Sequence, residues 1–335
     1  VAGGVLSSRK GVNVPGCSTG LPFMTEKDQA DIEFAVDQGI DFLALSFVSS
    51  AADIQIVRDI LKKKGREEVK LIAKIENREA IDNIDEIIEA ADSIMIARGD
   101  LGIEMPIRSV PVVQKRMIKK CYSSSKPVIV ATQMLESMTD NPMPTRAEVS
   151  DIANAIYDGT SVVMLSGETA AGKYPVETLR MMNTVIEETE EDIDYQSKLD
   201  EGVWKVIDKN VINAISEVAV IAAAKLDAKA IVVPTKTGNA VRMISSFRPA
   251  CTIIASTLDE TMQRQLNLSW GIYPILNKFI GDQKDFFENV IKEAVATELI
   301  HNGDQIIIAA GIPAGHQGST NMIKMHVVGE DVIGN

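Results

Sequence analysis

Residues 71–104 read LIAKIENREAIDNIDEIIEAADSIMIARGDLGIE, and this pattern sets the architecture expected for the whole chain. Two apolar runs, one near each end of the stretch, have the length and composition of buried β-strands. Between them Ile81, Ile84, Ile88 and Ala91 recur at helical spacing, which predicts a strand, a helix and a second strand. Strands joined by such a crossover helix run parallel, so their carboxyl ends meet at one edge of a sheet.

Charged residues follow both apolar runs. Lys74 and Glu76 end the first run, while Arg98 and Asp100 follow the second. Successive residues of a strand point to opposite faces, so Lys74 and Glu76 project from the same face. The carboxylates of Glu76 and Asp100 suit Mg²⁺ or Mn²⁺, which keeps part of its coordination shell for water and substrate oxygens. A neighbouring lysine can then stabilise negative charge that develops on a metal-bound substrate.

The same pattern recurs upstream and downstream. Apolar runs that end in polar residues are FLALSFV, VIVATQMLES and SVVMLSGETA, and the corresponding positions along the chain are Phe47, Glu76, Asp100, Thr132 and Ser166. A single polar strand end is often only the start of a solvated loop. Parallel sheets, however, collect their functional residues at the carboxyl ends of the strands, and the repetition therefore predicts a site.

The repeat also defines the organisation of the chain. Five strand-and-helix units lie between about residues 41 and 191, and alone this number suggests an open, doubly wound α/β sheet, since a closed (β/α)₈ barrel needs eight units. The acidic run EETEEDIDY, residues 187–195, is a reasonable domain boundary. Alternating apolar and polar segments after it predict a second α/β domain, which begins with a long apolar helix over residues 206–225.

Helix ends can be predicted from capping patterns. Thr25 with Asp28 and Thr145 with Glu148 have capping-box spacing, and so do Thr257 and Glu260.

The strings KIENREAIDNIDEI, ARGDLGIE, ATQMLESM, PTRAEVSDIANAIYDG and MLSGETAAGKYP closely resemble pyruvate kinase, and the resemblance covers nearly the whole chain. It implies a partial TIM (β/α)₈-type barrel, with five of the eight βα units, followed by a second α/β domain. Residues 1–13 would be a remnant of the lid (B) domain, 14–191 the catalytic barrel and 192–335 a C-terminal regulatory domain. The chain is therefore expected to be a fragment that lacks the N-terminal barrel units and most of the lid.

The resemblance also implies an activity, the Mg²⁺-dependent transfer of a phosphoryl group from phosphoenolpyruvate to ADP, which gives pyruvate and ATP in the last step of glycolysis. Lys74 would be the catalytic residue, and Glu76 and Asp100 would hold Mg²⁺ or Mn²⁺. Gly99, Asp100 and Thr132 would bind substrate together with Lys74, and Lys10 would contact the nucleotide. Ser166 and Glu168 are weaker candidates. K⁺ is expected as well, but its ligands are not in this chain, and the fragment alone is expected to show little turnover.

The predicted second domain contains a loop with possible ligand contacts, TKTGN, made of Thr235, Lys236, Thr237, Gly238 and Asn239. Its hydroxyls and free amides can cradle a phosphate, or they can simply cap the following helix. By resemblance, this loop and residues 315–320, GHQGST, would form an allosteric site for a sugar phosphate or a nucleotide. The family also implies a homo-oligomer, a tetramer.

Composition limits the possible partners. The 335 residues are 45% hydrophobic and carry a formal net charge of −13, which argues against a nucleic-acid partner. No apolar run approaches the roughly 18 to 20 residues that cross a membrane, and no signal peptide is visible, so a cytoplasmic protein is expected. Cys17, Cys121 and Cys251 are widely separated and are expected to be reduced thiols with structural roles.

Two other functions are compatible with parts of the pattern. Another metal-enolate reaction, such as carbon–carbon lysis or phosphonate formation, would use the same two carboxylates. A non-catalytic metabolite sensor would rely on the C-terminal domain. The uninterrupted ATQMLESM and MLSGETA strings favour the kinase over the first alternative, and the intact lysine and carboxylate set argues against the second.

Overall fold

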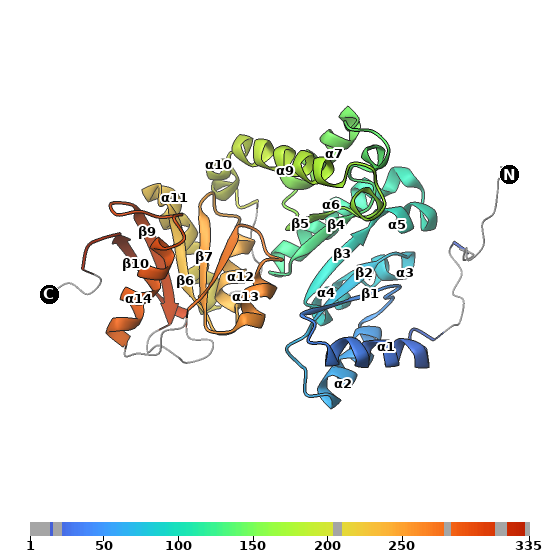
Figure 1. Ribbon diagram of the computed structural model, residues 1–335, viewed down its shortest axis with the longest axis horizontal. Coiled ribbons are helices and arrows are strands. Elements are labelled where there is room, and N and C mark those ends of the chain that lie inside the picture. The colour runs from blue at the N-terminus through green and yellow to red at the C-terminus, as the bar shows by residue number, and fades with distance from the viewer. Residues whose placement is uncertain (1–13, 16–21, 204–209, 278–282, 312–319, 332–335) are drawn as a thin grey trace.

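The computed structural model describes residues 14–15, 22–203, 210–277, 283–311 and 320–331, with the side chains of residues 283–285 left out. Within these ranges the chain forms two five-stranded sheets, each with its own helices. Figure 1 shows the first sheet in blue to green and the second in yellow to red, with the two sheets side by side.

All neighbouring strands of the first sheet are parallel, and they lie in chain order without a reversal. The strands are β1 (Phe42–Leu45), β2 (Lys70–Ile75), β3 (Ser93–Ala97), β4 (Val128–Ala131) and β5 (Val162–Met164). A doubly wound sheet reverses its strand order at a switch point, whereas a barrel wall does not. The observed order therefore confirms a partial, barrel-like sheet and corrects the doubly wound sheet that the number of units alone suggested.

Helices precede, connect and follow these strands. They are α1 (Glu26–Asp37), α2 (Ala51–Lys63), α3 (Arg78–Asp82), α4 (Ile84–Ala90), α5 (Arg98–Glu104), α6 (Val110–Ser123), α7 (Arg146–Tyr157), α8 (Gly167–Ala170), α9 (Pro175–Asp192) and α10 (Tyr195–Asp200), with single 3₁₀ turns at Ile107–Ser109 and Glu136–Thr139. The capping boxes at Thr25 and Thr145 are confirmed. The one helix predicted between β2 and β3 is instead two, α3 and α4, because Asn83 leaves helical geometry between them.

Alternate residues of the first sheet have different surroundings. Leu71, Ala73 and Ile75 of β2 belong to the large core that includes helix residues, whereas Ile72 belongs to a smaller cluster with Met95 and others on the opposite face. The helices thus cover one face, as they do in a barrel wall. Strands β3 and β4 are buried throughout, while β1 and β5, at the two sides of the sheet, are only partly buried.

The second sheet has the strand order β10-β9-β6-β7-β8, in which only the β10–β9 pair is antiparallel. Its strands are β6 (Ala230–Pro234), β7 (Thr252–Thr257), β8 (Ile272–Leu276), β9 (Gln305–Gly311) and β10 (Thr320–Val327). Separate cores on its two faces include residues of α11 (Val211–Leu226), α12 (Asn239–Ser246) and α13 (Glu260–Leu266) on one side and of α14 (Gln283–Val295) on the other. This is a three-layer α/β domain.

Of two predicted helix starts in this domain, one lies outside the described residues and the other is wrong. The start predicted at residue 206 falls in the range 204–209, which the structure does not describe; α11 is described from Val211, where the side chain of Asn210 accepts a hydrogen bond from the backbone N–H of Asn213 and caps the helix. Helix α13 is capped by Asp259, whose carboxylate accepts from the Met262 N–H, and not by Thr257, which is the last residue of β7.

The second domain contacts the amino ends of the first sheet. Arg248 is 3% exposed, and it donates hydrogen bonds to the Gly159 carbonyl at 2.6 Å and to the Ser161 hydroxyl at 3.2 Å, just before β5. Its guanidinium also lies over the Trp270 ring, 5.0 Å from the centroid. Arg264 pairs with Asp41, before β1, at 2.7 Å. The carboxyl ends of the strands, at the opposite edge, are free of these contacts.

Buried ionisable groups have shifted pKa values. Burial raises the pKa of the Cys121 thiol to about 12 and that of Cys251 to about 11, so both stay protonated at neutral pH and fit the structural roles predicted for them. Cys17 lies outside the described residues. Burial also lowers the pKa of Arg248 to about 10, which leaves its guanidinium charged at pH 7.

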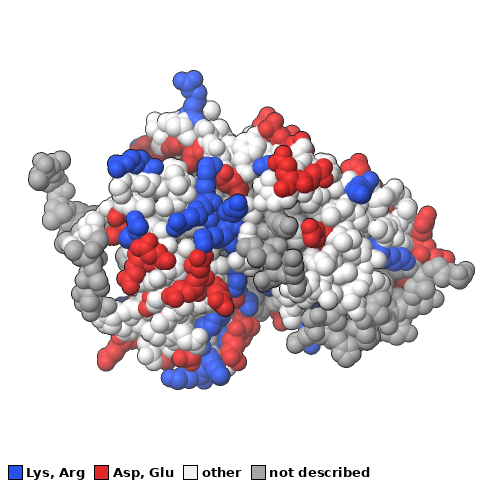
Figure 2. All heavy atoms as spheres, turned by 180° about the vertical axis from the view of Figure 1, so that it is seen from behind, with Lys and Arg blue, Asp and Glu red and all other residues white. Residues whose placement is uncertain are grey.

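Acidic and basic side chains are interspersed on the face shown in Figure 2, where Lys and Arg gather along the middle of the view. Among the residues that the structure describes, no helix combines the length and the apolar character needed to cross a membrane.

Asp92, which directly precedes β3, is the centre of a charged cluster at the amino ends of the strands of the first sheet. Its carboxylate accepts from Arg58 and from the Leu71 N–H, both at 2.9 Å, and lies 3.5 Å from the Lys70 ammonium. Burial alone would raise the pKa of Asp92, but Lys70, the Leu71 N–H and Arg58 together lower it below its ordinary value. Arg58 also donates to the Ala90 carbonyl at the end of α4, where a cation is favourable.

We predict that Arg248→Gln lowers the free energy of unfolding by about 2 to 4 kcal/mol, because it removes charge-assisted hydrogen bonds and a cation–π contact from a buried site. Arg264→Gln removes an exposed ion pair at the same domain contact and should change stability little. Urea unfolding of both variants and the parent chain measures the difference. Equal effects of the two substitutions would contradict the anchoring role of Arg248.

Asp92 also predicts a pH dependence. The pKa of Asp92 is lower in the folded chain than in the unfolded chain, where it is about 3.9. The contribution of Asp92 to stability is therefore fully present above about pH 3.9, and it is lost as the pH falls through the lower pKa of the folded chain. Asp92→Asn should therefore reduce stability at pH 7 and flatten the loss of stability below about pH 4, as measured by urea midpoints across pH. Asp85→Asn, at an exposed ion pair with Lys120, is the control that should keep the parent profile.

Candidate active site

The predicted site residues follow the carboxyl ends of the five strands. Ser46 and Phe47 come after β1, Glu76 directly after β2, Asp100 in the first turn of α5 after β3, Thr132 directly after β4 and Ser166 shortly after β5. Because the strands are parallel and in register, these positions share one edge of the sheet. This edge is opposite to the one that the second domain contacts.

Lys74 and Glu76 form a direct ion pair at this edge. The Lys74 Nζ atom lies 2.6 Å from Glu76 Oε1 and donates a second hydrogen bond to Ser46 Oγ at 2.9 Å. The other carboxylate oxygen of Glu76 accepts from the Phe47 backbone N–H at 2.6 Å. Glu76 is 3% exposed and the Lys74 side chain 25%. A buried carboxylate requires such partners, and here the ammonium remains accessible from one side.

Gly99 and Thr132, both predicted to bind substrate, contact each other. The Gly99 N–H donates to Thr132 Oγ1 at 2.8 Å, and the Thr132 hydroxyl donates to the Ala131 carbonyl at 2.6 Å. A Cβ atom on residue 99 would lie 3.4 Å from Thr132 Oγ1, which is an ordinary van der Waals contact, so space alone does not require a glycine here. Asp100, the next residue, is partly exposed.

The backbone is unusual at two of these strand ends. Phe47, Thr132 and Gln133 have φ values of 56°, 71° and 55°, in the left-handed region that non-glycine residues rarely adopt. Such conformations persist only where surrounding contacts enforce them, and they concentrate at functional sites. Here Phe47 is hydrogen-bonded to Glu76, and Thr132 is hydrogen-bonded to Gly99.

Two carboxylates at this edge are candidate metal ligands, the buried Glu76, whose oxygens now pair with Lys74 and the Phe47 N–H, and the partly exposed Asp100. No group of three or more His, Cys, Asp and Glu side chains suited to a metal occurs within the described ranges. Mg²⁺ does not require such a group, since it is usually held by one or two carboxylates with water and substrate oxygens in its remaining positions. A donor set of oxygens without imidazole or thiolate therefore fits Mg²⁺ or Mn²⁺.

Two charged residues hold the loop that carries Thr132. Arg98, 9% exposed, donates from Nε to the Ala131 and Thr132 carbonyls and pairs with Asp151. Glu168, 0% exposed, accepts from the Ser166 N–H at 2.6 Å and the Leu135 N–H at 3.3 Å.

Sequence reasoning gave Arg98 no role. Its only signal was an arginine placed directly after an apolar strand, a position usually occupied by a solvated residue.

The other predicted ligand positions lie away from this edge or cannot be placed. Lys10 and residues 312–319, most of the GHQGST loop, lie outside the described residues. In the TKTGN loop after β6, the Gly238 N–H donates to Thr235 Oγ1 at 2.8 Å, and Arg242 donates to the Thr237 carbonyl at 3.1 Å. Lys236 lies between these groups, and Asn239 begins α12. The loop thus forms hydrogen bonds of its own, and its use as an effector site stays a prediction.

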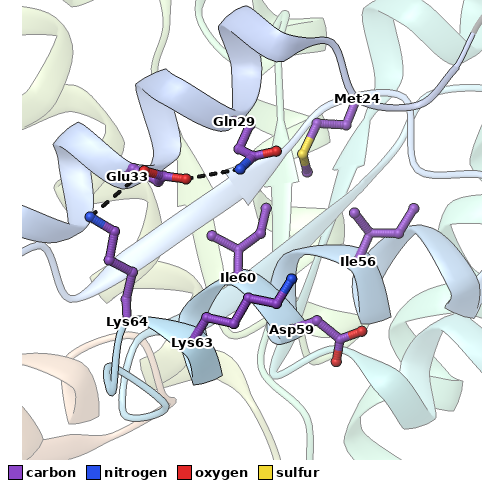
Figure 3. A pocket seen from close by; sticks show the side chains of 8 residues that line it. All are labelled: Met24, Gln29, Glu33, Ile56, Asp59, Ile60, Lys63 and Lys64. Atoms are coloured by element: carbon purple, nitrogen blue, oxygen red, sulfur yellow. Dashed lines mark hydrogen bonds and ion pairs between the residues drawn. The ribbon is translucent and has the colours of Figure 1, made fainter.

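A pocket of about 340 Å³ lies between α1 and α2 and includes none of the predicted site residues (Figure 3). Its lining is Met24, Gln29, Glu33, Ile56, Asp59, Ile60, Lys63 and Lys64. Gln29 donates to Glu33 at 2.9 Å, and Lys64 lies 3.7 Å from the same carboxylate. Gln29 and Glu33 are thus paired within α1, and Glu33 also pairs with Lys64 at the end of α2.

Two family models match the chain, the barrel domain of pyruvate kinase over residues 1–179 and the alpha/beta domain of pyruvate kinase over residues 213–326. Pyruvate kinases from Sporosarcina psychrophila and Geobacillus stearothermophilus are each 47% identical to it over 98% of the chain and 56% of their own length. The chain therefore spans a little over half of these relatives.

A crystal structure of a pyruvate kinase from Cryptosporidium parvum superposes with a TM-score of 0.87 at 39% identity, over 94% of this chain and 64% of that one. The sequential parallel sheet with its helices on one face and the separate α/β domain agree with both family matches. On this evidence the chain belongs to the pyruvate kinase family.

Proposed function

We propose that this chain supplies the catalytic lysine and the metal ligands for the transfer of a phosphoryl group from phosphoenolpyruvate to ADP. The observation that carries the proposal is the arrangement of the Lys74 ammonium between Glu76 and Ser46, at the strand edge that also holds Asp100 and the Thr132–Gly99 pair. Membership of the pyruvate kinase family supports it.

In this reaction the bond between phosphorus and the enol oxygen of phosphoenolpyruvate breaks, and a terminal phosphate oxygen of ADP forms the new bond to phosphorus. The enolate left behind takes a proton at carbon and becomes pyruvate. Phosphoryl transfer demands mainly positioning and charge stabilisation from the protein. Lys74 is suited to stabilise the enolate oxygen and the transferring group, because its ammonium is fixed by two partners yet still accessible.

Glu76 and Asp100 would hold Mg²⁺ or Mn²⁺. When bound, such an ion would supply positive charge that offsets the negative charge on the phosphate and the enolate. One oxygen of Glu76 already faces Lys74, so the same carboxylate can orient the ammonium and serve as a metal ligand. The Thr132 hydroxyl and the amides near Gly99 would bind the substrate carboxylate, which requires the Gly99 N–H to exchange its bond with Thr132 for one with the ligand.

Other features remain proposals that rest on the family. The lid remnant would be residues 1–13, the barrel 14–191 and the regulatory domain 192–335, with Lys10 at the nucleotide. K⁺, a homotetramer, a cytoplasmic location and an effector at Thr235–Asn239 follow from the same resemblance. Residues 1–335 alone should turn over little substrate, since the first sheet has five strands and a closed barrel has eight.

The metal ligands can be tested without turnover. The affinity of the 335-residue chain for Mn²⁺ can be measured by water proton relaxation. It should fall at least about tenfold in Glu76→Gln and in Asp100→Asn, because removal of residues that only orient a metal ligand already lowers metal affinity 10- to 100-fold. Glu79→Gln, at an exposed position three residues beyond Glu76, should bind Mn²⁺ as the parent does. Unchanged affinity in both ligand variants would exclude this metal site.

The activity itself requires a completed barrel. The N-terminal part of the Geobacillus stearothermophilus enzyme joined to this chain should form ATP from phosphoenolpyruvate and ADP in a lactate dehydrogenase coupled assay, whereas the chain alone should not. Lys74→Met should lower kcat by about 10² to 10³, since it removes an electrostatic stabiliser of the transition state. Lys62→Met, exposed on α2, is the control. A loss below about tenfold at Lys74 would remove this residue from the proposed role.

A further inference from the structure

We infer that Arg98 is a positioning residue for the substrate-binding hydroxyl of Thr132, and that Asp151 fixes Arg98 in this role. The inference rests on the proposed function for its catalytic consequence. The contacts themselves are independent of that function, because they lie entirely within the folded chain.

The Arg98 side chain reaches from the first residue of α5 to the end of the neighbouring strand β4. Its Nε atom donates to the Ala131 carbonyl at 3.3 Å and to the Thr132 carbonyl at 3.2 Å, and one terminal nitrogen contacts the Thr132 carbonyl and the Met134 sulfur. The other terminal nitrogen pairs with Asp151 of α7. One buried guanidinium thus joins the start of α5, the end of β4 and α7.

These contacts determine the direction of the Thr132 side chain. Thr132 and Gln133 both have left-handed φ values, a conformation that must be enforced by neighbours. Arg98 binds the two carbonyls that flank the Thr132 backbone, and this orientation of the peptide directs Thr132 Oγ1 toward the Gly99 N–H, 2.8 Å away. Both ends of this contact are therefore held by one residue, since Gly99 directly follows Arg98 in the chain.

A planar guanidinium is required for this task. Its fork of N–H donors can serve two carbonyls and a carboxylate at the same time, whereas a lysine ammonium is a point charge on a flexible stem. Asp151 is 38% exposed, and its carboxylate binds the inner guanidinium from the solvent-exposed side. Removal of Asp151 should leave Arg98 in place but free to rotate.

The first test is amide hydrogen exchange of the 335-residue chain, measured by mass spectrometry. Arg98→Gln should increase exchange at least about tenfold in peptides that cover residues 97–100 and 131–135, with the core strand β9 unchanged, because the effect is local. Asp151→Asn should give a smaller increase in the same peptides, and Arg98→Lys should not restore protection. Arg78→Gln, at an exposed ion pair on α3, is the matched control. A uniform increase over the whole chain would show that Arg98 only stabilises the fold.

The second test uses the chimera with a completed barrel. Arg98→Gln and Thr132→Val should each lower kcat/KM for phosphoenolpyruvate at least about tenfold and leave the KM for ADP unchanged. The double variant should lose no more kcat/KM than either single variant, because the effects of substituting two residues that act through one another are not additive. Additive losses, or a normal kcat/KM in Arg98→Gln, would overturn the positioning role. An inactive parent chimera would instead count against the proposed function, and the exchange measurement would still decide whether Arg98 positions Thr132.

Discussion

The constraint on which this structure depends is the common direction of the five strands in the first sheet. Because each strand is parallel to its neighbours, every carboxyl end lies at one edge and every amino end at the other. The first edge carries the Lys74–Glu76 pair, and the second carries the contacts to the α/β domain, among them the buried guanidinium of Arg248. The candidate site and the domain contact are thus separated by the length of the strands, as the barrel architecture favours.

Much of this fold was predictable because it depends on local patterns. Apolar runs with helical segments between them gave the strand-and-helix order, and a threonine followed three residues later by an acid gave the starts of α1 and α7. The errors arose where local signals compete. Thr257 and Asp259 are both acceptable caps, and only the length of β7 decides between them. Strand order, which separates a barrel wall from a doubly wound sheet, requires distant pairings that no local pattern contains.

The candidate site also combines contacts that the sequence predicts with contacts that it does not. Lys74 and Glu76 were predictable as neighbours, since residues two apart in a strand share a face. The bond between Gly99 and Thr132 was not, because it joins residues 33 apart in sequence through a backbone conformation that threonine rarely adopts. Arg98 escaped prediction for a related reason. Its partners are carbonyl oxygens and a helix residue 53 positions away, and backbone carbonyls leave no trace in a sequence.

The burial of Glu76 has a thermodynamic consequence for any ligand that arrives at this edge. With an ammonium on one carboxylate oxygen and a peptide N–H on the other, the side chain has a single orientation in the folded chain. Its rotational entropy is therefore lost when the protein folds, and not when an ion or a substrate associates. An encounter with this carboxylate needs only the exchange of one partner for another, without a search among rotamers.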